Sequence, residues 1–572
     1  MAASEWLQIG LFFVLLLALV KPLGGYMAAV YSGEKTFLSP EVRPVEGFIY
    51  RLTGTSPDEE MTWKQYSIAV LLFNLAGIVF LYLLLRLQHV LPLNSAAMPP
   101  IAPDQAFNAA VSFVTNTNWQ SYSGEASMSL FSQTVGFTVQ NFLSAATGMA
   151  VMMALIRGLI RKQTANLGSF WVDLTRGILY ILLPLSIVLG IVLAGLGSVQ
   201  TLSPALQATP LDSPAAQTIA AGPVASQVAI KHLGTNGGGF MNANAAHPFE
   251  NPSPLSNLLL MLAETAIPVA LTFTYGKLVG DTRQGWAILT AMIILLLAFT
   301  TLACVSEAAG NPALAKAAPA GMTLDQSQGN MEGKEVRFGA PVSALFASIT
   351  TATSSGAVIA SHDSFMPLGG LSALVLMQLG EVVPGGVGSG MYGILIFVIV
   401  AVFISGLMVG RTPEYLGKKI EPFEIKMAAL LILIMPLLVL SLTAVALMTA
   451  AGQAGITNPG PHGLSQVLYG FTSMGNNNGS AFAGLNANTM FYNLAGAAAM
   501  FIARFWLIIP TLALAGSLAG KKKIPVGAGT LPTTTPLFIG WLVLIILIVG
   551  ALNFLPVLAV GPIIEHLFMA GL

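Results

Sequence analysis

The sequence contains little charge and almost no cysteine. Only 8% of its 572 residues are Asp, Glu, Lys or Arg and the formal net charge is zero, so no nucleic-acid partner is expected. Cys304 is the only cysteine, which excludes an intrachain disulfide and any metal site built from several thiolates. The chain has neither a Gly-x-x-x-x-Gly-Lys-Ser/Thr loop nor an Asp-Lys-Thr-Gly motif, so we expect no ATP hydrolysis by this chain itself.

Hydrophobic residues dominate instead. They make up 55% of the chain and the mean hydropathy is +0.76, which predicts an all-α polytopic membrane protein. A span needs about 20 apolar residues. About ten such runs occur, at 7–31, 66–92, 128–156, 173–198, 254–278, 286–308, 366–409, 427–451, 489–518 and 537–560. The first run lacks a basic start and a clear cleavage site, so it is interpreted as a helix rather than a signal peptide.

Lys and Arg are distributed unevenly between these runs. If the ten spans alternate in direction, seventeen of the 24 basic residues lie on one side, among them the run 521–523. The other side holds only four, namely Lys231, Lys316, Lys334 and Arg337. The positive-inside rule makes the basic side cytoplasmic. Both termini are then predicted to be extracytoplasmic.

Four short polar stretches recur between the apolar runs. They are Thr115-Asn116-Thr117, Thr235-Asn236-Gly237, Ser354-Ser355-Gly356 and Asn477-Asn478-Gly479. When their last residues are aligned, the intervals are 120, 119 and 123 residues, which predicts a duplicated unit of helix, half helix, filter-like stretch and helix. The predicted division is an extra helix with a cytoplasmic segment (1–65), four repeats (66–165, 166–283, 284–420 and 421–524) and an extra C-terminal helix (525–572). Prolines argue against a long helix in 32–65.

This plan favours a cation site at one centre. Four half helices that point their partly negative C-terminal ends inward would attract a cation. Glycine lets the backbone turn its carbonyls toward an axis, and Thr, Ser and Asn add oxygens without net charge. The stretches contain no carboxylate, so a potassium ion fits better than calcium or magnesium. The alternative is that the glycines only allow close helix packing.

A few charges and a glycine-rich break lie within the apolar runs. Glu381 and Arg504 each follow the end of their own stretch by 25 residues, which predicts a pair below the filter. Glu264 is predicted to face a cavity. Proline and four glycines in 384–390 interrupt a run too long for one span, so this segment is predicted to unwind the helix, or alternatively to be only a packing kink. Thr117 departs from the glycine of the other stretches.

The motifs resemble a known family. The segments 111–124, 233–251, 411–419 and 476–484 are similar to the KdpA family, the potassium-binding, channel-like subunits of the Kdp potassium-importing ATPase. The four-unit plan also resembles the Trk, Ktr and HKT transporters of the same superfamily. The resemblance implies a bacterial inner-membrane complex with a P-type ATPase subunit that hydrolyses ATP, small accessory membrane subunits and surrounding lipid. It implies potassium as the transported ion and no organic cofactor.

The resemblance also implies a set of functional residues. The predicted filter consists of Asn116, Thr117, Thr235, Asn236, Gly237, Ser354, Ser355, Gly356, Asn477, Asn478 and Gly479. Gln120 matches a family position associated with potassium affinity. In related transporters a comparable break in the third unit is a gate beneath the filter. By analogy with plant relatives, the hydroxyl residue Thr117 would weaken selection against sodium. The predicted gate and intramembrane pair consist of Glu381, Gly385, Gly386, Gly388, Gly390 and Arg504. Two alternatives remain, a self-sufficient Trk/Ktr/HKT-like channel or symporter and a purely structural membrane subunit.

Overall fold

The computed structural model describes residues 3–203, 205–212, 215–317, 319, 322–525 and 530–571. Over these residues, ten helical spans are long and apolar enough to cross a membrane, which confirms an all-α polytopic protein. The spans are α1 (Ala3–Tyr31), α3 (Trp63–Leu87), η1 (Ser132–Thr138) with α6 (Val139–Ile160), α7 (Phe170–Arg176) with η2 (Gly177–Leu182) and α8 (Leu183–Gly195), α10 (Pro254–Val279), α11 (Thr282–Ala308), α15 (Ser389–Val409), α16 (Pro422–Met448), α19 (Met490–Gly520), and α20 (Pro536–Leu558) with η5 (Ala559–Ile563) and α21 (Ile564–Ala570).

Each polar stretch follows a short helix that cannot cross a bilayer. These half helices are α4 (Pro103–Val114), α9 (Val224–Leu233), α13 (Gly339–Ala352) and α18 (Pro461–Gly475). The longest has 15 residues, which corresponds to about 22 Å, against roughly 30 Å of hydrocarbon. A proline lies at or close to each N-terminus, where its missing N–H costs no helical hydrogen bond. Every half helix therefore ends inside the bundle, at a polar stretch.

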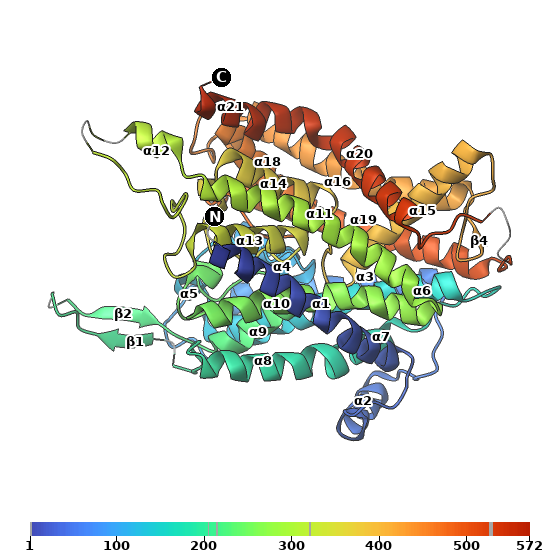
Figure 1. Cartoon of the computed structure of the whole chain (residues 1–572). Coiled ribbons are helices and arrows are strands. Elements are labelled where there is room, and N and C mark those ends of the chain that lie inside the picture. Colours follow the sequence, from blue (N-terminus) through green and yellow to red (C-terminus); the bar gives the residue numbers. More distant parts are fainter. Residues whose placement is uncertain are drawn as a thin grey trace.

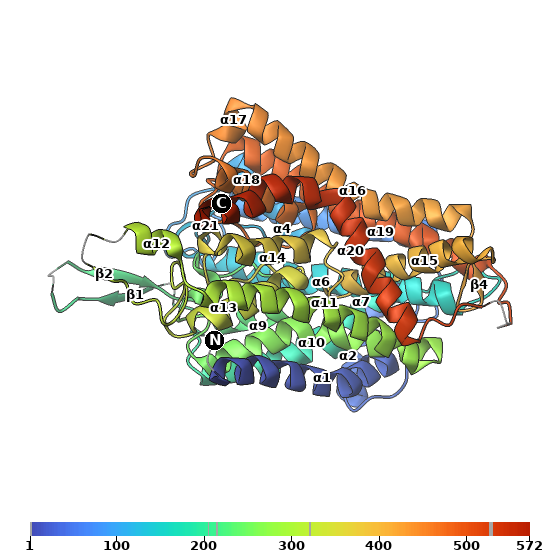
Figure 2. The same ribbon diagram turned by 45° about the horizontal axis from the view of Figure 1, so that its top comes forward.

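Burial separates the central spans from the outer ones. The hydrophobic windows of η1–α6 and α10 are 83% and 78% buried, whereas those of α1 and α20–α21 are 33% and 22% buried. α1 packs on α10, and α20 packs on α11 and α15 (Figures 1 and 2). The two helices that were predicted to be additions to the repeats thus lie at the periphery, and the filter lies among the central spans.

The two ends of the bundle differ. One end carries both termini, α12 (Pro312–Ala317) and an antiparallel hairpin in which β1 (Ala205–Ala208) pairs with β2 (Gln217–Ala220) (Figures 1 and 2). The opposite end carries a second hairpin, β3 (Glu414–Tyr415) with β4 (Lys418–Lys419). The remaining short helices are α5 (Gly124–Ser127), α17 (Ala450–Gln453), η3 (Asn244–Ala246) and η4 (His362–Ser364). Termini at one end are what an even number of spans requires.

The proline-rich segment 32–65 contains more helix than predicted. α2 (Ser39–Thr53) has 15 residues and includes Pro44. Pro40 lies in its first turn, where proline is tolerated. Glu46 ties the helix to the bundle through a 3.0 Å ion pair with Arg176. Tertiary contacts thus offset the cost of the proline inside the helix.

The apolar run 366–409 is interrupted at the predicted place. α14 (Pro367–Gln378) is separated from α15 by the ten-residue loop 379–388. The backbone N–H of Gly385 donates to the carbonyl of Ala352, the last residue of α13, at 2.8 Å, and that of Val387 donates to Thr235 Oγ1 at 3.1 Å. The loop is therefore tied to the half helix of its own unit and to the polar stretch of the second.

Candidate ion-binding filter

The four polar stretches share one backbone conformation. In each, two residues with positive φ, here called the first and third positions, flank a second position without it. The pairs are Thr235 and Gly237, Ser354 and Gly356, Asn477 and Gly479, and, one residue later than the predicted stretch, Asn116 and Asn118. The N–H of the second residue donates back into the half helix, from Thr117 to Ser112, Asn236 to Lys231, Ser355 to Thr350 and Asn478 to Ser473. In an extended chain successive carbonyls point to opposite sides, and a left-handed residue at alternate positions turns them to the same side. The conformation is thus suited to a row of carbonyl ligands.

This geometry corrects the predicted alignment of the first stretch by one residue. Asn118, with φ +52°, occupies the position of Gly237, Gly356 and Gly479, and Thr117 corresponds to Asn236. The intervals between the corrected positions are 119, 119 and 123 residues. Because Asn tolerates the left-handed region better than other residues with side chains, it can stand where the other units use glycine. Thr117 is therefore not the departure from glycine, and the expectation of weakened selection against sodium loses its basis.

Backbone contacts close the four stretches into a ring. A Cβ atom added at Gly237 would overlap the Ser355 carbonyl, one at Gly356 would overlap the Asn478 carbonyl, and one at Gly479 would overlap the Thr117 carbonyl. The units thus follow one another in the order second, third, fourth, first. A Cβ at Gly238 would lie 2.8 Å from the Cβ of Asn118, which completes the circle. Glycine is required here both by positive φ and by the approach of the neighbouring chain.

Side chains tie the same four units together. The hydrogen bonds are Asn236 Nδ2 to Asn116 Oδ1 (2.6 Å), Ser355 Oγ to Glu264 Oε1 (2.7 Å), Asn478 Nδ2 to Glu381 Oε1 (2.8 Å) and Asn477 Nδ2 to Thr117 Oγ1 (2.9 Å). The polar side chains of the second positions are therefore engaged with protein partners. The oxygens best placed to bind an ion are the backbone carbonyls, and the side chains mainly hold the ring at a fixed size.

Glu264 and Glu381 occupy places that the sequence did not predict. Glu264, on α10, is fully buried behind the filter, where it accepts from Ser355 Oγ at 2.7 Å and lies 2.8 Å from His232 Nδ1, and it lines neither of the cavities beside the ring. Glu381 binds Asn478, while Arg504 Nη2 donates to the Ser144 carbonyl at 3.0 Å. No ion pair joins Glu381 and Arg504 in the described structure, which corrects the predicted pair. The equal distances in sequence from the stretches to Glu381 and Arg504 did not place the two side chains together. The helix of the third unit is interrupted at Glu381, whereas α19, which carries Arg504, is continuous.

Cavities lie on both sides of the ring. The outer cavity, of about 870 Å³, reaches the third residue of every stretch. Gln120 lies at its wall and exchanges two hydrogen bonds with the backbone of Gly239, at 2.9 and 3.0 Å, which join the first and second units. The inner cavity, of about 80 Å³, begins at Asn116, Ser354 and Asn477. A passage along the ring axis would connect the two cavities.

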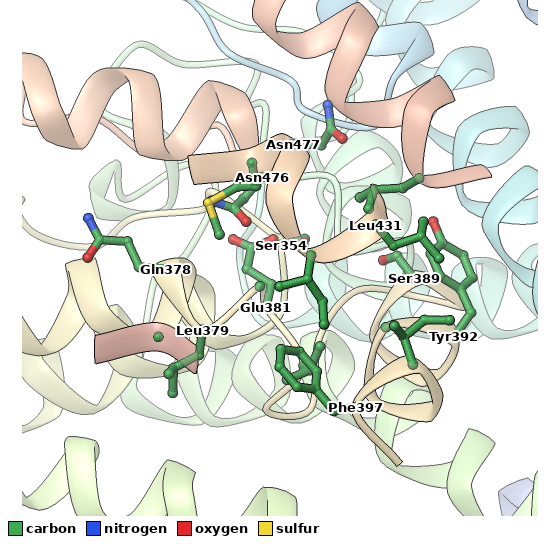
Figure 3. A pocket seen from close by; sticks show the side chains of 18 of the residues that line it. Ser354, Gln378, Leu379, Glu381, Ser389, Tyr392, Phe397, Leu431, Asn476 and Asn477 are labelled. Carbon is green, nitrogen blue, oxygen red and sulfur yellow. The ribbon is translucent and has the colours of Figure 1, made fainter. Parts of the chain in front are cut away.

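The inner cavity extends sideways beneath the filter. Figure 3 shows Glu381 next to Ser354 and Asn476, with Tyr392 and Phe397 of α15 on another part of the wall. Residues of α16, α19 and α20, such as Leu431, Leu507 and Val549, also line it. Glu381 Oε2 has no hydrogen-bond partner among the described residues. Glu381 thus lies at the cavity wall close to the inner end of the ring, with one buried carboxyl oxygen that has no partner among the described residues.

Of the predicted gate glycines, Gly385, Gly386 and Gly388 lie in the loop under the ring, and Gly390 lies in the first turn of α15. A Cβ at Gly385 would overlap the backbone of Gly390, and one at Gly388, with φ +85°, would overlap the Gly148 carbonyl on α6. Gly386 packs near the Ser354 side chain. The loop is thus a tightly fitted structure, in which glycine is needed for close backbone approach.

Among the described residues, no group of three or more His, Cys, Asp or Glu side chains could hold a metal ion. The ring instead offers neutral backbone oxygens, which suit a dehydrated monovalent cation.

One further cluster was not expected from the sequence. Lys231, Asn244 and Glu250 are buried next to Gly237, and the only sequence signal was a charged lysine inside a short half helix.

Comparison with known proteins agrees with this geometry. The family described as KdpA, potassium-transporting ATPase A subunit, matches residues 10–567. The potassium-transporting ATPase potassium-binding subunit of Herpetosiphon aurantiacus is 58% identical over 580 residues and is covered completely, as is this chain. The protein of the same description from Methylorubrum extorquens is 58% identical over 566 residues, covering 99% of this chain and 98% of the relative.

A solved structure, the potassium transporter TrkH from Vibrio parahaemolyticus, superposes with a TM-score of 0.49 at 14% identity, over 76% of this chain and 83% of that one. The family match extends over nearly the whole sequence, and the two curated relatives align from end to end or nearly so. The chain belongs to the KdpA family.

Proposed function

We propose that this chain binds and selects extracytoplasmic potassium ions and passes them into an ATP-driven import complex, without hydrolysing ATP itself. The observation that carries the proposal is the closed ring of four stretches, in which glycines at Gly237, Gly356 and Gly479 meet the carbonyls of neighbouring units. A ring of neutral carbonyls held at a fixed size can replace the hydration shell of potassium. The family relatives are named as potassium-binding subunits of a potassium-transporting ATPase.

The proposed binding machinery follows from the corrected register. The eleven predicted filter residues keep their place in the proposal, and Asn118 joins them at the outer level of the first unit. Their proposed roles differ. The backbones supply the ligands, while the side chains of the second positions, such as Asn236 and Asn478, hold neighbouring units together. Gln120 would position the first unit against the second.

The route below the ring is proposed to turn sideways. The loop 379–388 lies under the third stretch, and the inner cavity extends between α15, α16, α19 and α20. An ion that leaves the ring would first meet the free oxygen of Glu381. This arrangement suits a subunit that delivers ions to a P-type ATPase partner within the membrane, with small accessory subunits beside it. Gly385, Gly386, Gly388 and Gly390 would then form the barrier to straight passage.

The proposed location is the bacterial inner membrane, with both termini extracytoplasmic. The support is the excess of basic residues on the opposite side. The buried Cys304 leaves a clean background for labelling. A maleimide that cannot cross the membrane should label Leu211→Cys in intact spheroplasts and Lys522→Cys only after lysis. The reverse pattern would overturn the orientation.

The functional test is purification of the chain from its native membrane. A complex with a P-type ATPase subunit, whose ATP hydrolysis is stimulated by potassium at far lower concentrations than by sodium, is the expected result. Liposomes that contain this chain alone should show no potassium uptake. Uptake by the chain alone would instead favour a self-sufficient channel or symporter, and a complex with no potassium dependence would overturn the proposal.

A further inference from the structure

A fully buried lysine lies beside the filter of the second unit. Lys231 occupies the last turn of α9, where a cation interacts favourably with the helix dipole. Its ammonium group contacts the Glu250 carboxylate and donates to Asn244 Oδ1 at 2.9 Å. The side chains of Lys231 and Glu250 are both 0% exposed. Because burial of an ion pair is costly, an apolar residue would serve packing at least as well at this position.

Asn244 connects this lysine to the filter. Its Nδ2 donates to the Gly237 carbonyl at 2.6 Å, while its Oδ1 accepts from Lys231 and from the backbone N–H of Ala245. Asn244 itself has φ +54°, in the left-handed region that asparagine tolerates better than most residues. The result is a chain of contacts, Lys231 to Asn244 to Gly237, which we term the Lys231–Asn244 relay.

The relay makes the ring unequal. Asn118, Gly356 and Gly479 hold the same position in the other three units, and in the described part of the chain their carbonyls accept no side-chain hydrogen bond. Of the four carbonyls at this level of the ring, the Gly237 carbonyl therefore already accepts a hydrogen bond, from the Asn244 side-chain amide. That amide is a stronger donor than usual, because the lysine ammonium polarises it from the other side.

We propose that the Lys231–Asn244 relay is a specificity-determining element of the outer filter level, in which Asn244 is the positioning residue for the Gly237 carbonyl. This inference rests on the proposed function. A carbonyl oxygen that already accepts a hydrogen bond is a weaker ligand for a cation. Sodium is smaller than potassium and costs more to dehydrate, so weaker ligands disfavour sodium more than potassium. The same hydrogen bond also fixes the carbonyl in place, so the ring cannot contract around sodium. Both effects act toward selection of potassium.

The test uses the full complex and compares ions. Asn244→Asp removes the donor and keeps the side-chain shape, and Lys231→Met removes the polarising charge. For each complex, the concentrations of potassium and of sodium that half-maximally stimulate ATP hydrolysis are measured, together with the melting temperature. The sodium-to-potassium ratio of these concentrations should fall about fivefold or more in both variants, as expected for the loss of one hydrogen bond.

Lys334→Met is the matched control. Lys334 is also 0% exposed and pairs with a buried carboxylate, Glu307, at 2.8 Å, but its contacts do not reach a filter carbonyl. The sodium-to-potassium ratio of the Lys334→Met complex should stay unchanged even if its melting temperature falls. An unchanged ratio in assembled Asn244→Asp and Lys231→Met complexes, or an equal fall in Lys334→Met, would overturn the relay. If the unaltered complex shows no potassium stimulation, the proposed function itself fails.

Discussion

Asn478 of the fourth unit donates a 2.8 Å hydrogen bond from Nδ2 to Oε1 of Glu381 in the third unit. One carboxylate oxygen thus supports the filter, and the other is free beside the inner cavity. In the proposed function, the two oxygens of this side chain would connect the level where ions are selected with the level where they leave. Glu381 would then have a larger role than the predicted pairing with Arg504 implied.

Replacing Glu381 by Gln should slow ion delivery without opening the ring. The amide oxygen can still accept from Asn478, but the second carboxyl oxygen is replaced by an amide NH2, which cannot bind a cation. Loss of one cation ligand worth about 1–2 kcal/mol corresponds to roughly a tenfold lower maximal rate of potassium-stimulated ATP hydrolysis. Glu264→Gln is the comparison, because Glu264 lies behind the filter and should change the half-saturating potassium concentration more than the rate. Equal maximal rates in Glu381→Gln and the unaltered complex would contradict the role.

Gly237→Ala should weaken potassium binding. The added Cβ would overlap the Ser355 carbonyl, and φ at this residue is +86°, where alanine is strained. A cost of about 1–3 kcal/mol at the ring corresponds to roughly a tenfold or larger rise in the half-saturating potassium concentration. Gly540→Ala, on α20 with nothing near its Cβ, should leave that concentration unchanged. If Gly237→Ala also leaves it unchanged, close packing is the better explanation of the glycines.

The corrected register predicts opposite results for two neighbouring substitutions. Asn118→Gly gives the first unit the residue that the others have and loses only the 2.7 Å bond to Asn141, so potassium dependence should shift by a few-fold at most. Thr117→Gly removes the hydroxyl that accepts from Asn477 and contacts Thr115 at 2.8 Å, so the joint between the fourth and first units should loosen. The half-saturating potassium concentration for ATP hydrolysis is measured for both variants. A smaller effect of Thr117→Gly than of Asn118→Gly would contradict the corrected register and favour the alignment of Thr117 with the glycines.

The sequence predicted the spans well and the local geometry less well. Bilayer thickness determines how long an apolar span must be, so the ten spans and the break in 366–409 could be predicted from the lengths of the apolar runs. Backbone dihedrals leave a weaker signal: Asn118 was passed over because the alignment relied on glycine, although Asn also adopts positive φ. Side-chain partners such as that of Glu381 depend on tertiary packing, which no periodicity describes. The Lys231–Asn244 contact was hidden for the same reason.

Stability should fall at alkaline pH through His462. Burial disfavours the imidazolium, but hydrogen bonds to Asp363 and Glu565 outweigh this effect and raise the pKa of His462 to about 10 from its usual 6.5. The contribution is complete below pH 6.5 and is lost as pH rises through about 10. The melting temperature of the unaltered protein should therefore drop between pH 7 and pH 10 by more than that of His462→Gln. Parallel curves for the two proteins would show that this cluster does not contribute.

The central claim is that the ring itself binds potassium, and anomalous diffraction from a rubidium-exchanged crystal of the complex tests it most directly. Rubidium is close to potassium in size and can be located by its own signal. The account predicts rubidium density on the axis of the ring formed by Asn118, Gly237, Gly356 and Gly479, displaced by excess potassium and not by sodium. A fully occupied rubidium site elsewhere in the chain, with an empty ring, would contradict it.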